Sequence, residues 1–200
     1  MREKITFPKE KTWHDYVEKT WFEITCGEAP FMVSRYDSTT GVAIPLADRI
    51  GFLDRKLRIV NENTDTLDAW FKYALDAYQS VRAYEWQGDS LFLARENLLY
   101  TFVDNFEYKF DTRPSVELVR KIANVISWNV FQMDGLKSVV PNTCHDVVTK
   151  DLYGNIETHP CPGCKKYKRT GHNGIPALLK DWEDGFHYPY EILYTLHKKK

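Results

Sequence analysis

Apolar side chains recur every three or four residues through most of the chain, which is the spacing of amphipathic helices. The clearest case begins at Thr66, a residue type that often caps a helix N-terminus. Its apolar stripe consists of Leu67, Trp70, Phe71, Ala74, Leu75, Tyr78 and Val81. This pattern predicts a helix that packs one face against a core.

Four further segments show the same period and are predicted to be helical. They run from Thr12 to Phe22, from Pro45 to about Val60, from Asp89 or Ser90 to about Phe110, and from Ser115 to about Met133. Strand-like patterns are confined to Phe31–Tyr36 and to Ile175–Trp182, and the latter also suits a short helix. The predicted fold class is therefore mainly α, with α+β as the alternative if a few short strands form.

The pattern changes after Pro141, where helical periodicity gives way to cysteines, histidines and turn residues. We therefore predict a helical domain over residues 1–140 and an irregular lobe with a C-terminal tail over residues 141–200, packed as one unit. A chain of 200 residues is long enough to bury a substantial core.

Composition limits the partners. The net charge of −1 provides no global field that would attract the chain to nucleic acid or to a membrane, so a polyanion site must be local. No apolar run reaches the ~20 residues of a membrane span, and the first residues lack the apolar stretch of a signal peptide. Four cysteines without an export signal favour a cytoplasmic location.

Three of the four cysteines and three of the six histidines lie between Asn142 and Gly174. Two of these cysteines flank Pro-Gly, which is the spacing of a metal knuckle, a tight turn that points two sulfurs at one ion. Zinc takes four such ligands, usually in a tetrahedron. The predicted ligands of a structural zinc ion are Cys144, Cys161, Cys164 and His172, with His145 or His159 as alternatives for the fourth. Reduced surface thiols, or a disulfide within the Pro-Gly pair, would account for the same pattern without a metal.

A basic cluster directly follows this knuckle, and a rigid turn that carries lysines suits contact with phosphates. A solvated surface explains the same cluster equally well. Two amide side chains at the end of the fifth predicted helix could read a base edge, because amides pair with adenine. The candidate DNA-binding residues are Lys165, Lys166, Lys168, Arg169, Asn129 and Gln132.

A second polar group surrounds the start of the fourth predicted helix. It consists of Glu85, Gln87, Asp89, Arg95 and Asn97. Helix capping explains part of this group, and a polar site between helices is the alternative. A metal-dependent nuclease based on Glu85 and Asp89 has little support, because two-metal cleavage needs several carboxylates around the ions.

Several long strings carry a family resemblance. They are Thr20-Trp-Phe-Glu-Ile, Cys26-Gly-Glu-Ala-Pro, Ser34-Arg-Tyr-Asp, Ile50-Gly-Phe-Leu-Asp-Arg-Lys-Leu-Arg, Glu85-Trp-Gln-Gly-Asp, Leu93-Ala-Arg-Glu-Asn-Leu-Leu and Ile126-Ser-Trp-Asn-Val-Phe-Gln-Met-Asp-Gly-Leu-Lys. Together they resemble the C-terminal region of bacterial and phage adenine-specific DNA methyltransferases of restriction-modification systems, over roughly Thr12 to Trp182. The resemblance implies a role in DNA modification.

The resemblance does not supply a catalytic site. Such methyltransferases also need a Gly-containing S-adenosylmethionine loop and an Asn- or Asp-Pro-Pro-aromatic catalytic tetrapeptide, and the sequence shows neither pattern. The sequence therefore predicts that the isolated chain neither binds S-adenosylmethionine nor transfers a methyl group. No catalytic residue is assigned.

Three functions are compatible with these observations. The first is a non-catalytic DNA-recognition or accessory module of a DNA modification system, alone or with a methyltransferase subunit. The second is a phage or mobile-element protein that binds and inhibits a host defence complex, which the near-neutral charge favours. The third is the nuclease.

Overall fold

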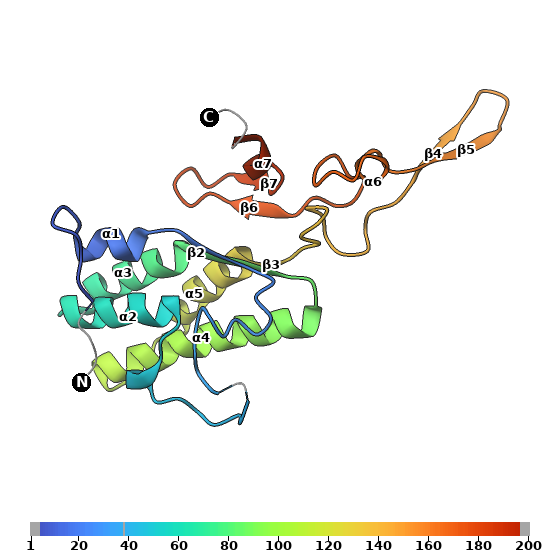
Figure 1. Ribbon diagram of the computed structural model, residues 1–200. Helices are drawn as coiled ribbons and strands as arrows, with labels where there is room; N and C mark the ends of the chain where they lie inside the picture. Colours follow the sequence, from blue (N-terminus) through green and yellow to red (C-terminus); the bar gives the residue numbers. More distant parts are fainter. Residues whose placement is uncertain (1–4, 38, 197–200) are drawn as a thin grey trace.

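The chain is a mixed α/β protein, so the prediction of a mainly α fold is wrong. The computed structural model describes residues 5–37 and 39–196. These residues form seven α-helices, one 3-10 helix and seven short strands. Figure 1 shows a helical body beside a small sheet, and a thin lobe that projects away from both.

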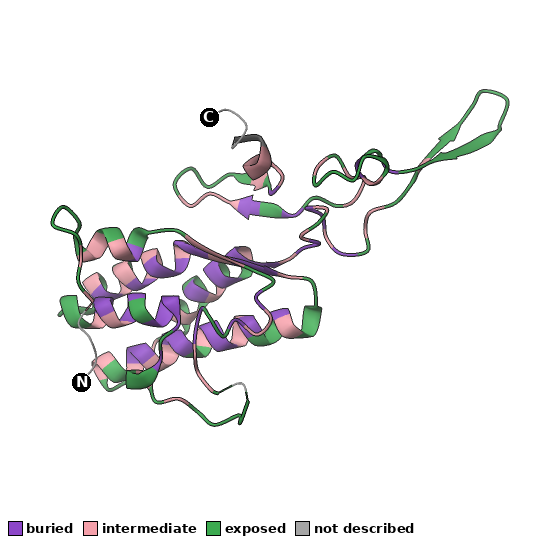
Figure 2. Cartoon of the chain, in the orientation of Figure 1, coloured by how far each residue is buried: buried purple, intermediate pink, exposed green. Residues whose placement is uncertain are grey.

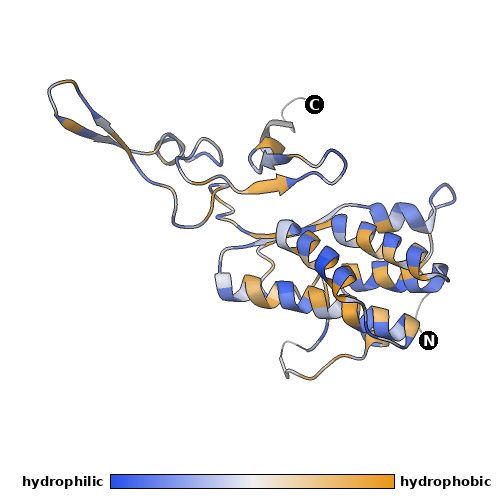
Figure 3. Ribbon diagram, turned by 180° about the vertical axis from the view of Figure 1, so that it is seen from behind, coloured by the Kyte–Doolittle hydropathy of each residue, from blue (hydrophilic) through white to orange (hydrophobic). Residues whose placement is uncertain are grey.

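The helices of the body follow the apolar stripes. They are α1 (Trp13–Glu18), α2 (Phe52–Asn63), α3 (Leu67–Gln79), α4 (Gly88–Phe110) and α5 (Val116–Asn129), with a 3-10 helix at Leu46–Asp48. The predicted cap at Thr66 is confirmed, and the side chains of Thr12 and Ser115 cap α1 and α5 in the same way, since each of the three accepts a hydrogen bond from a first-turn backbone amide. Figure 3 shows hydrophobic and hydrophilic residues alternating along these helices, as amphipathic helices require.

The strands explain the wrong fold class. β1 (Trp21–Ile24), β2 (Val81–Glu85) and β3 (Val130–Gln132) form a parallel sheet in the order β1-β2-β3. Each strand follows a helix after at most two residues, and each has only three to five residues. The predicted helices therefore ran on into these strands, because a short apolar run fits a strand and a helix end equally well.

The sheet is covered on both faces, as parallel sheets generally are. Alternate residues such as Val81, Ala83 and Val130 face the helices and join their core. Their neighbours Tyr84 and Phe131 face the opposite side. There the sheet is covered by the C-terminal elements β6 (Leu178–Lys180), β7 (His187–Pro189) and α7 (Ile192–Leu196).

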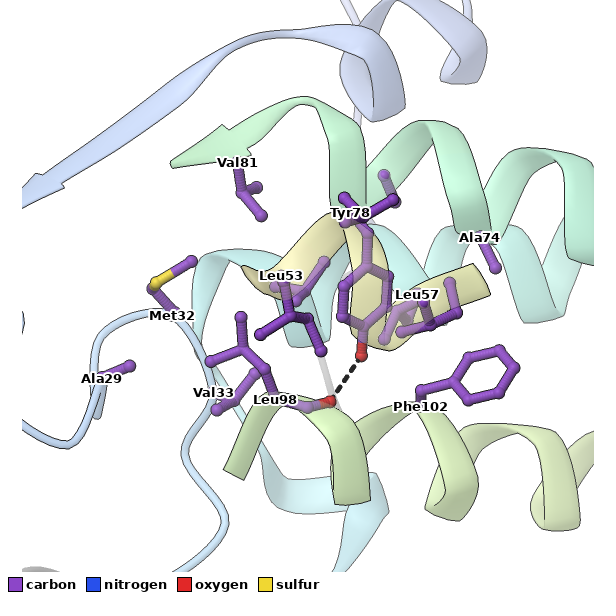
Figure 4. Packing of buried hydrophobic residues seen from close by; sticks show 14 of the residues in the cluster. Ala29, Met32, Val33, Leu53, Leu57, Ala74, Tyr78, Val81, Leu98 and Phe102 are labelled. Carbon is purple, nitrogen blue, oxygen red and sulfur yellow. Dashed lines mark hydrogen bonds between the residues drawn. The ribbon is translucent and has the colours of Figure 1, made fainter. Parts of the chain in front are cut away.

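The helical core is closely packed around aromatic side chains. Figure 4 shows Tyr78 among Leu53, Leu57 and Phe102, with its hydroxyl donating a 2.7 Å hydrogen bond to the Leu98 carbonyl. All of these side chains are almost completely buried. This contact ties α3 to α4, and these two helices lead into and out of β2.

The projecting lobe consists of residues 141–174. The chain leaves the sheet at Val140 and returns at Ile175, where the amide of the first donates to the carbonyl of the second at 2.8 Å. The lobe contains β4 (Val147–Lys150), β5 (Ile156–His159) and α6 (Pro162–Lys165). Ala177, Leu179 and Tyr190 pack against Tyr84 and Phe131 of the sheet, so the projecting lobe ends before these residues. Figure 2 shows that its hairpin is exposed on all sides.

Candidate functional site

The lobe brings three cysteines and one histidine together. Cys144 approaches Cys161 and Cys164 with sulfur–sulfur distances of 3.6 and 3.7 Å. The Nδ1 atom of His172 lies 3.5 Å from the first two sulfurs and 3.6 Å from the third. All four atoms lie within 4.8 Å of one another, so these four residues could hold a metal ion.

Local contacts set the orientation of His172 and provide a hydrogen bond to the Cys161 sulfur. The Nε2–H of His172 donates a 2.8 Å hydrogen bond to the Lys168 carbonyl, which leaves Nδ1 free to coordinate. The ring packs against Gly163, where any Cβ would lie 2.7 Å from it. Glycine is therefore required between the two knuckle cysteines. The amide of Asn173 points at the Cys161 sulfur at 3.4 Å.

Hydrogen bonds also prepare the Cys161 sulfur for coordination. Burial acts to raise the pKa of this thiol, but backbone amides of Cys164 and Asn173 and the Cys144 side chain outweigh burial and lower the pKa to about 6. Burial and the neighbouring sulfurs raise the pKa of Cys144 to about 11. A thiolate is the form that binds metal, and a bound cation favours that form at every sulfur.

The two alternative histidines lie outside the cluster. Nδ1 of His145 is 2.9 Å from the Thr143 carbonyl, and Nε2 of His159 is 3.3 Å from the Glu157 carboxylate. His172 is therefore the histidine of the candidate metal centre. All four cysteines are free thiols.

The candidate DNA-binding residues differ in their exposure and in the contacts of their side chains. Lys165, Lys166 and Lys168 are exposed on or just after α6 in the lobe. The guanidinium of Arg169 instead lies 5.8 Å from the ring centre of Tyr194. Gln132, at the end of β3, donates to the Trp86 carbonyl at 2.9 Å. Arg169 is also exposed, so the three lysines differ from it only in having no such side-chain contact among the described residues.

Asn129 is not available to a base edge. Its side chain is 1% exposed, and its amide nitrogen contacts the carbonyls of Tyr78, Gln79 and Val81 at 2.9 to 3.0 Å. Its oxygen accepts from the indole of Trp182 at 2.9 Å. The predicted base contact by Asn129 is therefore contradicted, because helix spacing alone did not reveal that this residue ends α5 inside the protein.

A second candidate site lies where the carboxyl ends of the three parallel strands meet. Glu85, the last residue of β2, accepts hydrogen bonds from the amides of Gly27, Trp86 and Gln87 at 2.8 to 3.0 Å. Gly27 follows β1, and the Glu85 carbonyl accepts from the amide of Met133, just after β3. One carboxylate and its backbone thus connect all three loops.

A cavity of about 370 Å³ lies beside the loop after β1. Its wall includes Phe31 and Pro30 from this loop and Asn97 from α4. Asn97 donates to the Glu28 carbonyl at 3.1 Å and to the Tyr36 hydroxyl at 3.2 Å. The cavity therefore combines apolar surface with a small polar network, which is typical of small-molecule sites.

One carboxyl group in this cavity lacks a complete set of partners. Oε2 of Glu23 is buried without a hydrogen bond among the described residues. Burial raises the pKa of Glu23 to about 7. The Cys26 thiol is also buried, and burial with the nearby Glu23 and Glu85 raises its pKa to about 12. Cys26 is thus a poor nucleophile.

The predicted polar group is divided between different places. Glu85 and Gln87 lie at the sheet edge, Asn97 lies at the cavity, and Asp89 is exposed in the first turn of α4. Arg95 donates to the Val130 carbonyl at 2.8 Å and so ties α4 to β3. Sequence reasoning missed Gly27, Glu28 and Tyr36, because only the parallel strand order shows that the loop after β1 meets the end of β2.

Comparisons with protein families, with curated proteins and with solved structures found no match to this chain. Within the described residues, no helix has the length and apolar character needed to cross a membrane.

Proposed function

We propose that this chain binds an adenosyl cofactor and contacts DNA as a non-catalytic module of a DNA modification system. The observation that carries this proposal is the junction of three strand-end loops at Glu85. In open α/β sheets, ligands bind at the carboxyl ends of the parallel strands, and an acidic side chain after the second strand holds the ribose of a nucleoside cofactor. Glu85 occupies that position in the chain.

The local chemistry fits a nucleoside. A carboxylate offers about four lone-pair sites, and backbone amides use three of those on Glu85, so one remains for a ribose hydroxyl. The neighbouring cavity has a mixed wall, in which Pro30, Phe31 and Val33 provide apolar surface that suits a base, and its volume is within the usual range for small ligands.

The resemblance to adenine-specific methyltransferases makes S-adenosylmethionine the proposed cofactor. This proposal departs from the sequence expectation of no cofactor binding, which rested on the absence of a Gly-rich loop. In the fold Gly27 lies in the loop after β1, and its amide donates to the Glu85 carboxylate at 2.8 Å.

Methyl transfer itself is not proposed for this chain alone, because no Asn- or Asp-Pro-Pro-aromatic tetrapeptide occurs in the 200 residues. A methyltransferase subunit or segment would have to supply it. The nuclease gains no support either. Among the described residues, the one cluster of three or more potential metal ligands is the Cys144–His172 group, which includes neither Glu85 nor Asp89.

Zinc is the proposed metal of the lobe. A tetrahedron with Zn–S bonds of about 2.3 Å and Zn–N bonds of about 2.0–2.1 Å has S–S edges of roughly 3.8 Å and S–N edges of roughly 3.5 Å. Five of the six separations, two S–S of 3.6 and 3.7 Å and three S–N of 3.5 to 3.6 Å, match these edges, and the sixth, between Cys161 and Cys164, lies within 4.8 Å. Four protein ligands would leave no open position, so the ion would stabilise the lobe rather than catalyse a reaction.

Calorimetry with S-adenosylhomocysteine and S-adenosylmethionine tests the cofactor site. We expect micromolar binding to the wild-type chain, and an affinity roughly tenfold to a hundredfold lower for Glu85→Gln, because hydrogen bonds to charged groups contribute about 1.5–3 kcal/mol. Glu157→Gln, on the exposed hairpin, is the matched control and should bind normally. A folded wild-type chain that binds neither ligand at millimolar concentration would refute the cofactor role.

A further inference from the structure

The β4–β5 hairpin is a two-stranded ribbon whose side chains are exposed, apart from the half-buried Val147 at its base. It projects beyond α6 and away from the helical body in both Figure 1 and Figure 3. Leu152 and Tyr153 at its tip are 102% and 92% exposed, and Tyr167 beside the knuckle is 98% exposed. Large apolar side chains at such exposure are typical of a surface that another molecule covers.

The two faces of the ribbon differ in charge. The register pairs Val148 with Thr158 and Lys150 with Ile156, so these four side chains share one face. That face carries aliphatic groups and one cation, whereas the acidic Glu157 lies on the other face. The remaining acid, Asp151, is occupied within the turn, where its carboxylate accepts hydrogen bonds from Tyr153 and Asn155.

The charge of the whole lobe indicates an anionic partner. Between the first and last metal ligands, Cys144 and His172, five Lys and Arg residues stand against three Asp and Glu, a formal charge of +2 before the metal and its thiolates are counted. The entire chain carries −1, so the remainder is negative. A polyanion would therefore be repelled by the rest of the chain and attracted to the lobe, which carries the hairpin.

We propose that the hairpin inserts into a groove of duplex DNA, with Leu152 and Tyr153 against the bases and the lysines after the knuckle on the phosphates. A two-stranded ribbon fits the major groove, which is about 12 Å wide. Phosphate contacts hold the register while base contacts give sequence preference. The metal centre would fix the angle between the hairpin and Lys165, Lys166 and Lys168, since its ligands lie on both sides of the ribbon. This inference rests on the DNA contact in the proposed function.

Two variants of the full, metal-loaded chain separate these roles in binding titrations with a randomised pool of duplexes and with duplexes selected from it. Leu152→Ser combined with Tyr153→Ser should lower affinity for selected duplexes roughly tenfold to a hundredfold and leave the salt dependence unchanged. Changing Lys165, Lys166 and Lys168 to Ala should flatten the slope of log affinity against log salt by roughly 2.7, at about 0.9 per phosphate.

Val116→Ser is the control, because Val116 is an exposed apolar residue on α5, 73% exposed, outside the lobe. It should bind DNA as the wild type does. If the Leu152→Ser and Tyr153→Ser variant bound DNA normally while the triple lysine variant bound weakly, the proposal that the hairpin enters a groove would be overturned. The proposal that the chain contacts DNA would stand. Wild-type protein that binds no duplex at low salt would overturn both, whereas cofactor binding in calorimetry would stand separately.

Discussion

Asn129→Ala is expected to destabilise the whole body, because this one side chain joins four parts of the chain. Its amide reaches the last turn of α3 and the first residue of β2, its own backbone ends α5, and its oxygen holds Trp182 of the C-terminal segment. The amide has two hydrogens that are shared among three carbonyls, and the oxygen accepts from Trp182 and, at 3.3 Å, from Arg82, so the substitution removes about four hydrogen bonds.

The magnitude follows from burial. A buried partner left without a hydrogen bond costs about 1–3 kcal/mol. The Tyr78 carbonyl also accepts from the amide of Ser80, which lessens its loss. We therefore expect the free energy of unfolding to fall by about 3–4 kcal/mol. For a chain of this size that corresponds to a Tm lower by roughly 6–16 °C.

Urea denaturation followed by circular dichroism measures this change, with the metal content of each protein kept equal. The control is Gln132→Ala, which removes one hydrogen bond near the surface and should change stability by less than ~1 kcal/mol. A loss below ~1 kcal/mol for Asn129→Ala, with an unchanged m-value, would refute the view that Asn129 organises the sheet. It would mean that the carbonyls around this side chain are satisfied without it.

Three further results are expected. Metal analysis of protein purified with reductant should find about one zinc per chain. Cys164→Ser should lose the metal and make the lobe sensitive to protease, whereas Cys26→Ser should retain the metal. Wild-type protein that is folded without metal would contradict this. The pKa of Glu23 is raised by burial to about 7 from an ordinary value of 4.5, so the folded state binds the extra proton and stability should fall as pH rises from 4.5 to 7. Glu23→Gln should remove that decline, which urea denaturation at several pH values can measure, and an unchanged pH profile would show that Glu23 does not cause it. Gly163→Ala should weaken metal binding, measured by competition with a chelator, because the new methyl group would overlap the His172 ring; equal affinity would show that the knuckle can shift.

The sequence was most informative where a pattern is local. Helix caps depend on residue type just before an apolar stripe, and Thr66 was identified on that basis. The knuckle cysteines were recognised in the same way, since a tight turn fixes the geometry of a short spacing. His172 was the first choice for the fourth ligand, with His145 and His159 as alternatives. Spacing could not decide among them, whereas the fold brings Nδ1 of His172 to 3.5 to 3.6 Å from the three sulfurs.

The parallel sheet and the loops at its carboxyl edge could not be predicted from the sequence, for a different physical reason. β1, β2 and β3 are separated by about 45 to 60 residues, and nothing in a single segment states which strand pairs with which. The bond between Glu85 and Gly27 spans 58 residues. A glycine pattern was therefore sought in one loop, although the proposed cofactor site consists of three loops that only the parallel pairing assembles.

Because Val140 and Ile175 lie close together, the segment between them can be deleted or replaced in evolution without disturbing the rest of the fold. A segment whose two ends are already neighbours can be removed and its ends joined by a tight turn, without any strand or helix of the body moving. Residues 141–174 would then be an exchangeable insertion, and the body would keep the sheet and the C-terminal elements β6, β7 and α7 that pack on it. Lineages could then exchange the proposed DNA contact of the hairpin while inheriting the same sheet edge and the cofactor site proposed there.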